Sequence, residues 1–153
     1  MDTDIHRLIE NLGAPDPDAR VAAAAALGQY GALHEDASGL SAAVPELLAA
    51  LGDESREVRW SAAYALGAIG EAAGVPSLLA LLADPGTEGG LRLVAVKALG
   101  KIGAADAAPA LIDALNKGGS RCLAAVTLRA LARIGTPEAL AAVEAWHTAQ
   151  DGA

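Results

Sequence analysis

The sequence predicts an all-α protein, an α-solenoid of about nine helices stacked as antiparallel pairs. Three observations predict this fold class. One phrase recurs four times, as AAAAALGQYG ending at Gly31, SAAYALGAIG at Gly70, VAVKALGKIG at Gly103 and TLRALARIG at Gly135. A second, proline-containing phrase lies between or after these copies. The apolar residues recur with a helical period throughout, and no segment alternates as a strand does.

Each unit of the array is therefore predicted to be a pair of helices. An amphipathic run at 3–12 opens the chain, with Ile5, Leu8, Ile9 and Leu12 on one face. Proline is tolerated in the first turn of a helix and glycine suits a left-handed C-cap, so the glycines are assigned to helix ends. The first interval is longer than the others because residues 31–41 form an extra loop. The second phrase reads AAVPELLAAL (42–51), GVPSLLALL (74–82), AAPALIDAL (107–115) and TPEALAAV (136–143).

Composition limits the function. The 153 residues suffice for one domain, which we expect to span 1–153. A net charge of −8 and a pI of about 4.7 disfavour binding to a phosphate backbone. Cys122 is the single cysteine, which excludes an internal disulfide, and we expect it to be a small buried residue. The acidic N-terminus and the lack of a long apolar run predict a cytoplasmic protein without a membrane anchor.

The repeated phrases resemble a known family. With the motif VRxxAAxALGxIG in one helix and AxPxLxxxL in the other, the chain is similar to the short HEAT-like repeats found in phycobilisome lyases. Residues 58–70 fit best, whereas the last copy has Ala124 where the motif has arginine and Ala132 where it has glycine. The resemblance implies a solenoid whose second helices line a concave surface.

A helical wheel divides residues 58–70 into two faces. Val58, Ala62 and Leu66 lie on the core face, and Trp60 and Tyr64 lie opposite, one turn apart. The equivalent positions in the next two copies carry four basic residues, while none of the 19 acidic residues falls on any such position. Like charges at i and i+4 oppose helix stability, so stability alone would not select them. We therefore predict a partner-binding surface of Trp60, Tyr64, Leu93, Lys97, Lys101, Arg129 and Arg133.

Structural roles are the alternative for these residues. Lys101 and Arg133 lie in last turns, where cations favour the helix dipole, and the aromatic pair could fill space between neighbouring helices. A structural role is expected outright for the three motif arginines, which should bond to turns of neighbouring repeats. Those arginines are Arg20, Arg59 and Arg92, with Asp53 and Asp84 as candidate partners.

No motif indicates catalysis, a cofactor or a metal. His6, His34 and His147 lie in separate elements, and neither a GxSxG motif nor a phosphate loop is present. Residues 34–36 (His-Glu-Asp) could form a weak metal site, although a solvated loop is the simpler interpretation. We therefore predict a protein that is not an enzyme.

The sequence thus predicts a scaffold or adaptor that binds a protein or an acidic peptide in a concave aromatic and basic groove. One alternative, suggested by the family name, is an accessory subunit of a phycobilin lyase. A nucleic-acid-binding protein is the least favoured alternative. The opening helix has a polar outer face, whereas the C-terminal helix has no partner after it. We therefore expect a monomer or a weak homodimer formed through the C-terminal helix.

Overall fold

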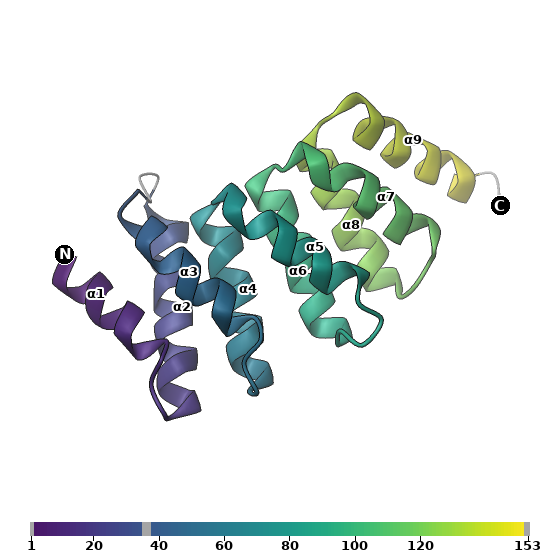
Figure 1. The fold of residues 1–153 in the computed structure, drawn as a ribbon. Helices are drawn as coiled ribbons and strands as arrows, with labels where there is room; N and C mark the ends of the chain where they lie inside the picture. Colours follow the sequence, from purple (N-terminus) through teal and green to yellow (C-terminus); the bar gives the residue numbers. More distant parts are fainter. Residues whose placement is uncertain (1, 35–37, 152–153) are drawn as a thin grey trace.

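The computed structural model describes residues 2–34 and 38–151, and these form an α-helical array without a strand (Figure 1). The prediction of an all-α solenoid is confirmed. Short 3-10 helices at Ser38–Ala43, Ala72–Gly74 and Ala105–Ala107 lead into α3, α5 and α7. The α-helices are α1 (Asp2–Asn11), α2 (Pro17–Leu33), α3 (Val44–Ala50), α4 (Arg56–Ile69), α5 (Val75–Ala83), α6 (Gly89–Ile102), α7 (Ala108–Asn116), α8 (Arg121–Ile134) and α9 (Pro137–Asp151).

The helices form two layers (Figure 1). One layer contains α3, α5 and α7, and the other contains α2, α4, α6 and α8. Each even-numbered helix packs along much of its length against the next, whereas α3, α5 and α7 touch one another sparsely. A stack that is tighter in one layer curves toward that layer, so the even-numbered helices lie on the inner side of the curve. The motif leucines Leu27, Leu66, Leu99 and Leu131 are fully buried between the layers.

Glycine allows the close approach of the even-numbered helices. A Cβ on Gly67 would lie 2.6 Å from the Cα of Ala98, and a Cβ on Gly100 would lie 2.7 Å from the Cα of Ala130. A Cβ on Gly28 would lie 2.8 Å from the ring of Tyr64 and 3.1 Å from the Cα of Ala65. The assignment of all motif glycines to helix ends is therefore wrong for these three, which lie inside helices where only a hydrogen atom fits.

Most helices begin or end at the prolines and glycines that the sequence predicts at helix ends. Gly70, Gly103 and Gly135 end α4, α6 and α8 in the left-handed conformation, and α3, α5 and α7 carry proline in their first turns. The prediction that Gly31 ends its helix is wrong, because α2 continues to Leu33. A Cβ on Gly31 would lie 3.1 Å from the backbone of Ala68, so this glycine serves a helix contact. The expected loop at 31–41 is thus largely helical, apart from residues 35–37, which lie outside the described part.

Arginines join consecutive repeats at the loops that precede the even-numbered helices. Arg20 Nε donates to Asp53 Oδ2 at 2.8 Å and Nη2 donates to Oδ1 at 3.0 Å, while Nη1 donates to two carbonyls of its own turn. Arg59 likewise bonds its own turn and reaches Glu88 Oε1 at 3.1 Å. The structural role predicted for these two arginines is confirmed. They fix the register of each repeat against the next.

The two ends of the array differ. Asp4, Arg7, Glu10 and Asn11 are all exposed on α1, as expected of a terminal helix. Cys122 is exposed near the start of α8, so the expectation that it is buried is wrong. The C-terminal helix, α9, packs on α8 and α7 and buries Ala139, while 44% of Leu140 remains exposed.

The glycine contacts generate a first prediction. Gly67→Ala should lower the free energy of unfolding by about 1–2 kcal/mol, because overpacking costs about 1–3 kcal/mol and outweighs a helix-propensity gain of about 1 kcal/mol. Gly90→Ala is the matched control, since a Cβ there meets nothing within 4 Å and should stabilise the helix. Urea unfolding of the two variants measures both effects. Equal stabilisation by both substitutions would show that the helices are not in close contact.

Asp53 generates a second prediction, on pH. The hydrogen bond from Arg20, aided by the backbone N–H of Ser55, lowers the pKa of Asp53. A lowered folded-state pKa contributes stability that is complete above about pH 5 and is lost as the pH falls through the ordinary aspartate pKa of about 3.9 toward the lowered value. Asp53→Asn should therefore lower the free energy of unfolding by about 2 kcal/mol at pH 7, because it removes a charged hydrogen-bond partner of Arg20 and leaves only the exposed carboxylate of Glu54, at 3.6 Å, as counter-charge. The difference from the wild type should shrink between pH 5 and pH 3 in chemical unfolding; a constant difference would contradict the assignment.

Candidate partner-binding groove

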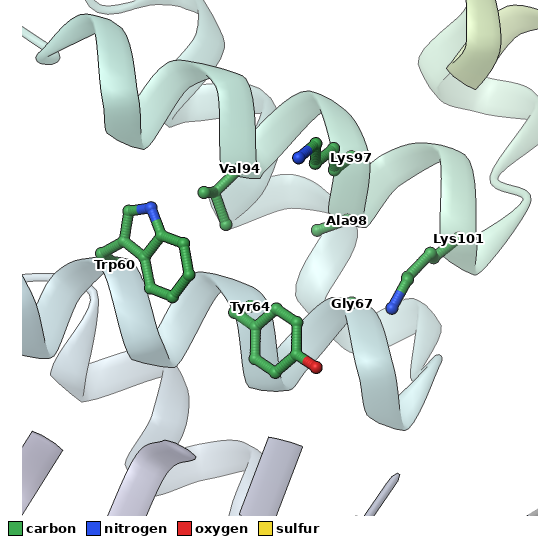
Figure 2. Close-up of a pocket in the computed structure, with 7 residues that line it drawn as sticks. All are labelled: Trp60, Tyr64, Gly67, Val94, Lys97, Ala98 and Lys101. Atoms are coloured by element: carbon green, nitrogen blue, oxygen red, sulfur yellow. The ribbon is translucent and has the colours of Figure 1, made fainter. Parts of the chain in front are cut away.

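Two adjoining pockets lie on the even-numbered helices. We call the first the aromatic pocket; its lining side chains come from α4 and α6 (Figure 2), and it has a volume of about 350 Å³. We call the second the basic pocket; it lies between α6 and α8 and has a volume of about 170 Å³. Together they form the groove. The aromatic pocket is lined by Trp60, Tyr64, Gly67, Val94, Lys97, Ala98 and Lys101, and the basic pocket by Lys97, Gly100, Lys101, Val126, Arg129, Ala130 and Arg133.

The aromatic pair is ordered by its position on α4. Trp60 and Tyr64 are four residues apart, and their rings stack with centroids 5.9 Å apart and planes only 7° from parallel. Trp60 is 46% exposed, whereas Tyr64 is half-buried against α2 and α6. Lys101 Nζ, on the facing helix, lies 5.3 Å from the centroid of the Tyr64 ring (Figure 2). The pocket therefore offers a flat apolar surface with a cation at its edge.

Four cations line the basic pocket. Lys97 and Lys101 project from α6, and Arg129 and Arg133 project from α8. All four side chains are exposed, and none forms an ion pair with any residue that the structure describes. Lys97 and Lys101 also line the aromatic pocket, so the two pockets share a wall. The arrangement concentrates uncompensated positive charge next to an apolar surface on a protein whose net charge is −8.

The neighbouring hollow between α2 and α4 has a different character. It is lined by Val21, Arg56, Glu57, Trp60 and Ser61, so Trp60 lies between it and the aromatic pocket. The backbone N–H of Glu57 itself, at the start of α4, and the Ser55 hydroxyl lower the pKa of the Glu57 carboxyl. Glu57 is thus an anion at neutral pH. The hollow therefore holds both a carboxylate, Glu57, and a guanidinium, Arg56, whereas the ionisable residues that line the basic pocket are all cations.

The structure places six of the seven predicted site residues in the groove. Leu93 is the exception, because it is half-buried against the core and lines neither pocket. Val94, the next residue, lines the aromatic pocket instead. The sequence-based predictions also did not include the small residues that line the two pockets where the helices touch. Gly67 contacts Ala98 there and Gly100 contacts Ala130, and we call these four residues the floor of the groove. The signal for the floor was present in the repeated ALG phrase, in the glycine that precedes each closing glycine by three residues.

The groove has two features that suit it to bind a ligand. Stacked aromatic rings and exposed cations suit a ligand that has both apolar and anionic groups. No cluster of three or more histidine, cysteine or carboxylate side chains suited to a metal occurs among the described residues. The possible metal site at 34–36 cannot be placed, since residues 35 and 36 lie outside them. Within the part of the chain that the structure covers, no helix is long and apolar enough to cross a bilayer.

Known proteins of similar structure are repeat proteins. The complex of CpcE and CpcF of phycocyanin lyase from Nostoc sp. PCC7120 contains a chain that is 29% identical, with a TM-score of 0.72 over 91% of this chain and 62% of that chain. An engineered protein is 28% identical, with a TM-score of 0.68 over 92% of this chain and 66% of that chain. A designed armadillo repeat protein shares the fold at 22% identity, with a TM-score of 0.68. This chain thus spans less than two thirds of the lyase chain's length. None of the curated proteins matches it.

Two family profiles match consecutive parts of the sequence. The profile for HEAT repeats matches residues 5–89, which is more than half of the chain. The profile for the PBS lyase HEAT-like repeat matches residues 91–117. Both matches agree with the paired helices, the buried motif leucines and the arginine contacts between repeats. The chain belongs to the family of HEAT repeat proteins.

Proposed function

We propose that this protein is a non-catalytic scaffold that binds a protein or an acidic peptide in the groove. The observation that carries the proposal is the shared wall between the pockets, where Lys97 and Lys101 stand next to the Trp60/Tyr64 stack without a counter-charge. Exposed like charges weakly oppose one another, and a bound anion removes this repulsion. An acidic ligand with an apolar side chain supplies both missing partners.

The two pockets have different roles in this proposal. An aromatic side chain that loses its contact with water contributes strongly to affinity, so Trp60 and Tyr64 form the anchor. Exposed cations act over longer distances and raise the association rate, so Arg129 and Arg133 attract the ligand.

A protein ligand fits the charge better than a nucleic acid does. Binding to a phosphate backbone needs many lysine and arginine contacts along a broad basic face. Here the basic pocket holds four cations on a chain of pI about 4.7. A short acidic segment of a protein matches a basic surface of that size, whereas a duplex would also meet the acidic remainder of the molecule.

A tetrapyrrole-handling role is the second candidate. Similarity to a chain of the phycocyanin lyase complex suggests it, and the stacked aromatic pair beside two lysines gives it a site. The rings would stack on the macrocycle, and the lysines would pair with its propionates. Co-expression with a bilin tests this role: absorbance in the visible that persists through purification and disappears in Trp60→Ala would support it.

Two further expectations belong to the proposal. The protein acts in the cytoplasm as one domain over 1–153, without a cofactor. It is a monomer or associates weakly through α9, where Leu140 is exposed. Sedimentation of Leu140→Glu against the wild type distinguishes these two states.

The groove cations generate a third prediction, on stability. The double variant Lys97→Gln and Arg129→Gln should change the free energy of unfolding by less than about 0.5 kcal/mol, because exposed residues without ion pairs contribute little to the fold. Arg20→Gln is the control, because Arg20 has a structural role. It should lower the free energy of unfolding by several times that amount, since it breaks the pair with Asp53. Thermal and urea unfolding measure both. A large loss in the groove variant would assign these residues to the fold rather than to binding.

A fourth prediction concerns binding itself. In a Trp146→Phe background Trp60 is the remaining tryptophan, and its fluorescence should respond saturably to a tryptophan-free peptide of alternating leucine and glutamate. Arg129→Glu with Arg133→Glu should weaken this binding by about tenfold and reduce its dependence on salt, because both cations face the ligand.

The control has the same change in net charge. Arg7 and Arg121 are exposed and lie outside the groove, so Arg7→Glu with Arg121→Glu should leave the affinity nearly unchanged. Equal losses in the two double variants would mean that overall charge, not the groove, attracts the peptide. A lack of response to any acidic peptide would overturn the proposal.

A further inference from the structure

Two of the three motif arginines, Arg20 and Arg59, bind the same chemical group, a carboxylate from the next repeat. Arg20 uses Nε and Nη2 to hold Asp53, which lies in the loop before α4. Arg59 uses Nη2 to hold Glu88, which lies in the loop before α6. Both arginines also bond carbonyls of their own turn. The guanidinium thus has one side for its own repeat and one side for an anion.

Arg92, the third motif arginine, lacks that anion. Its Nη2 donates to the carbonyl oxygens of Asp84 at 2.9 Å and Thr87 at 3.3 Å, which are in its own turn. Its Nε is buried and has no hydrogen-bond partner in the described part of the chain. The loop that should supply a carboxylate, before α8, reads Lys-Gly-Gly-Ser at 117–120 and contains none. The prediction that Arg92 bonds to a neighbouring repeat, with Asp84 as a candidate partner, is therefore wrong: Arg92 reaches only the backbone oxygen of Asp84, in its own turn, and the Asp84 carboxylate accepts from the backbone N–H of Gly86.

A cavity of about 400 Å³ lies between the same two repeats, and Arg92 lines it. Leu79, Leu82 and Leu123 contribute apolar walls, and Lys117 and Asp113 are also part of the lining. Lys117 Nζ lies 2.6 Å from Asp113 Oδ2, so these two opposite charges compensate each other and Arg92 is the cation of the lining that has no carboxylate in the described chain. The cavity shares no residue with the aromatic or the basic pocket. Its volume falls within the range of small-molecule sites.

We propose that this cavity binds an aliphatic carboxylate, with the carboxylate on the Arg92 guanidinium and the aliphatic part against the three leucines. A buried donor of a charged group is costly to leave without an acceptor, so an anion that reaches it recovers that free energy. Carboxylates are the groups that the two equivalent arginines hold. Since Nε is covered in the free protein, binding requires the Arg92 side chain to turn toward the cavity. The carboxylate can come from a free aliphatic acid or from the C-terminal leucine of a peptide.

Supplying the missing carboxylate in the chain tests the proposal. Gly118 lies two residues before the N-cap residue Ser120, just as Asp53 lies two residues before the N-cap residue Ser55. Gly118→Asp should therefore bond Arg92, and Gly118→Asn is the isosteric control, since both residues tolerate the positive φ of 76° at this position. The aspartate variant should melt at a higher temperature than the asparagine variant. Equal melting temperatures at pH 7 would overturn the claim that Arg92 lacks an anion.

Ligand binding is tested directly by NMR on the full chain. Sodium hexanoate should shift the Arg92 Nε–H signal and the methyl signals of Leu79 and Leu82 saturably, whereas hexanol and acetate should have much smaller effects. Gly118→Asp should bind hexanoate about tenfold more weakly than Gly118→Asn, because its own carboxylate occupies Arg92. Shifts of the same size with hexanol, or equal affinities of the two variants, would overturn the proposal.

Two peptide probes separate the sources of the carboxylate. A peptide that ends in a free leucine carboxylate should displace hexanoate, and its C-terminal amide should not, if the ligand is a peptide end. Displacement by neither peptide, with hexanoate still bound, assigns the site to a free acid. Neither result depends on the groove, so the proposed scaffold function stands or falls independently.

Discussion

The close approach of α4 to α6 and of α6 to α8 is the constraint on which the rest of the structure depends. Gly67 and Gly100 allow it, because a Cβ at either position would lie within 2.7 Å of the next helix. The odd-numbered helices have no such contact and lie further apart. The array therefore curves toward the even-numbered layer, and the side chains of that layer face one another across shallow pockets. A larger residue at the floor would separate the walls and remove the groove.

The last repeat departs from the motif at two positions, and both departures agree with the same constraint. Ala132 replaces the motif glycine in α8 and is exposed, since no even-numbered helix follows α8 in the described chain. Ala124 replaces the motif arginine at the position where Arg20 and Arg59 bind the next repeat. In the described chain only α9 follows α8, so a glycine or an arginine at these two positions would have no even-numbered helix to contact. The backbone of α8 still ends at Gly135 in the left-handed conformation, as α4 and α6 end at Gly70 and Gly103.

The sequence predicts the parts of the fold that depend on local chemistry. The prolines, the three left-handed glycines and the helical period are local signals, and the structure confirms them. Contacts between repeats are less accessible, because a helical wheel gives direction around one axis and not the position of the neighbouring helix. For this reason the helical wheel predicts Leu93 at a position where Val94 lines the pocket, and the sequence predicts a helix end at Gly31, where α2 continues to Leu33. The exposure of Cys122 and the unpaired Nε of Arg92 depend equally on which residues the adjacent repeat supplies.

The two pockets of the groove rest on junctions of different strength, and this difference suits their proposed roles. Between α4 and α6 the glycine contact is reinforced by the pair of Arg59 with Glu88, whereas between α6 and α8 Arg92 finds no carboxylate. An anchor contributes most when its walls are already in place, since ordering them on binding would reduce the affinity. Charges that attract a ligand over several ångströms tolerate small movements of the helix that carries them. The aromatic pocket thus lies at the better-held junction and the cations of α8 lie at the looser one, where adjustment to different acidic ligands costs least.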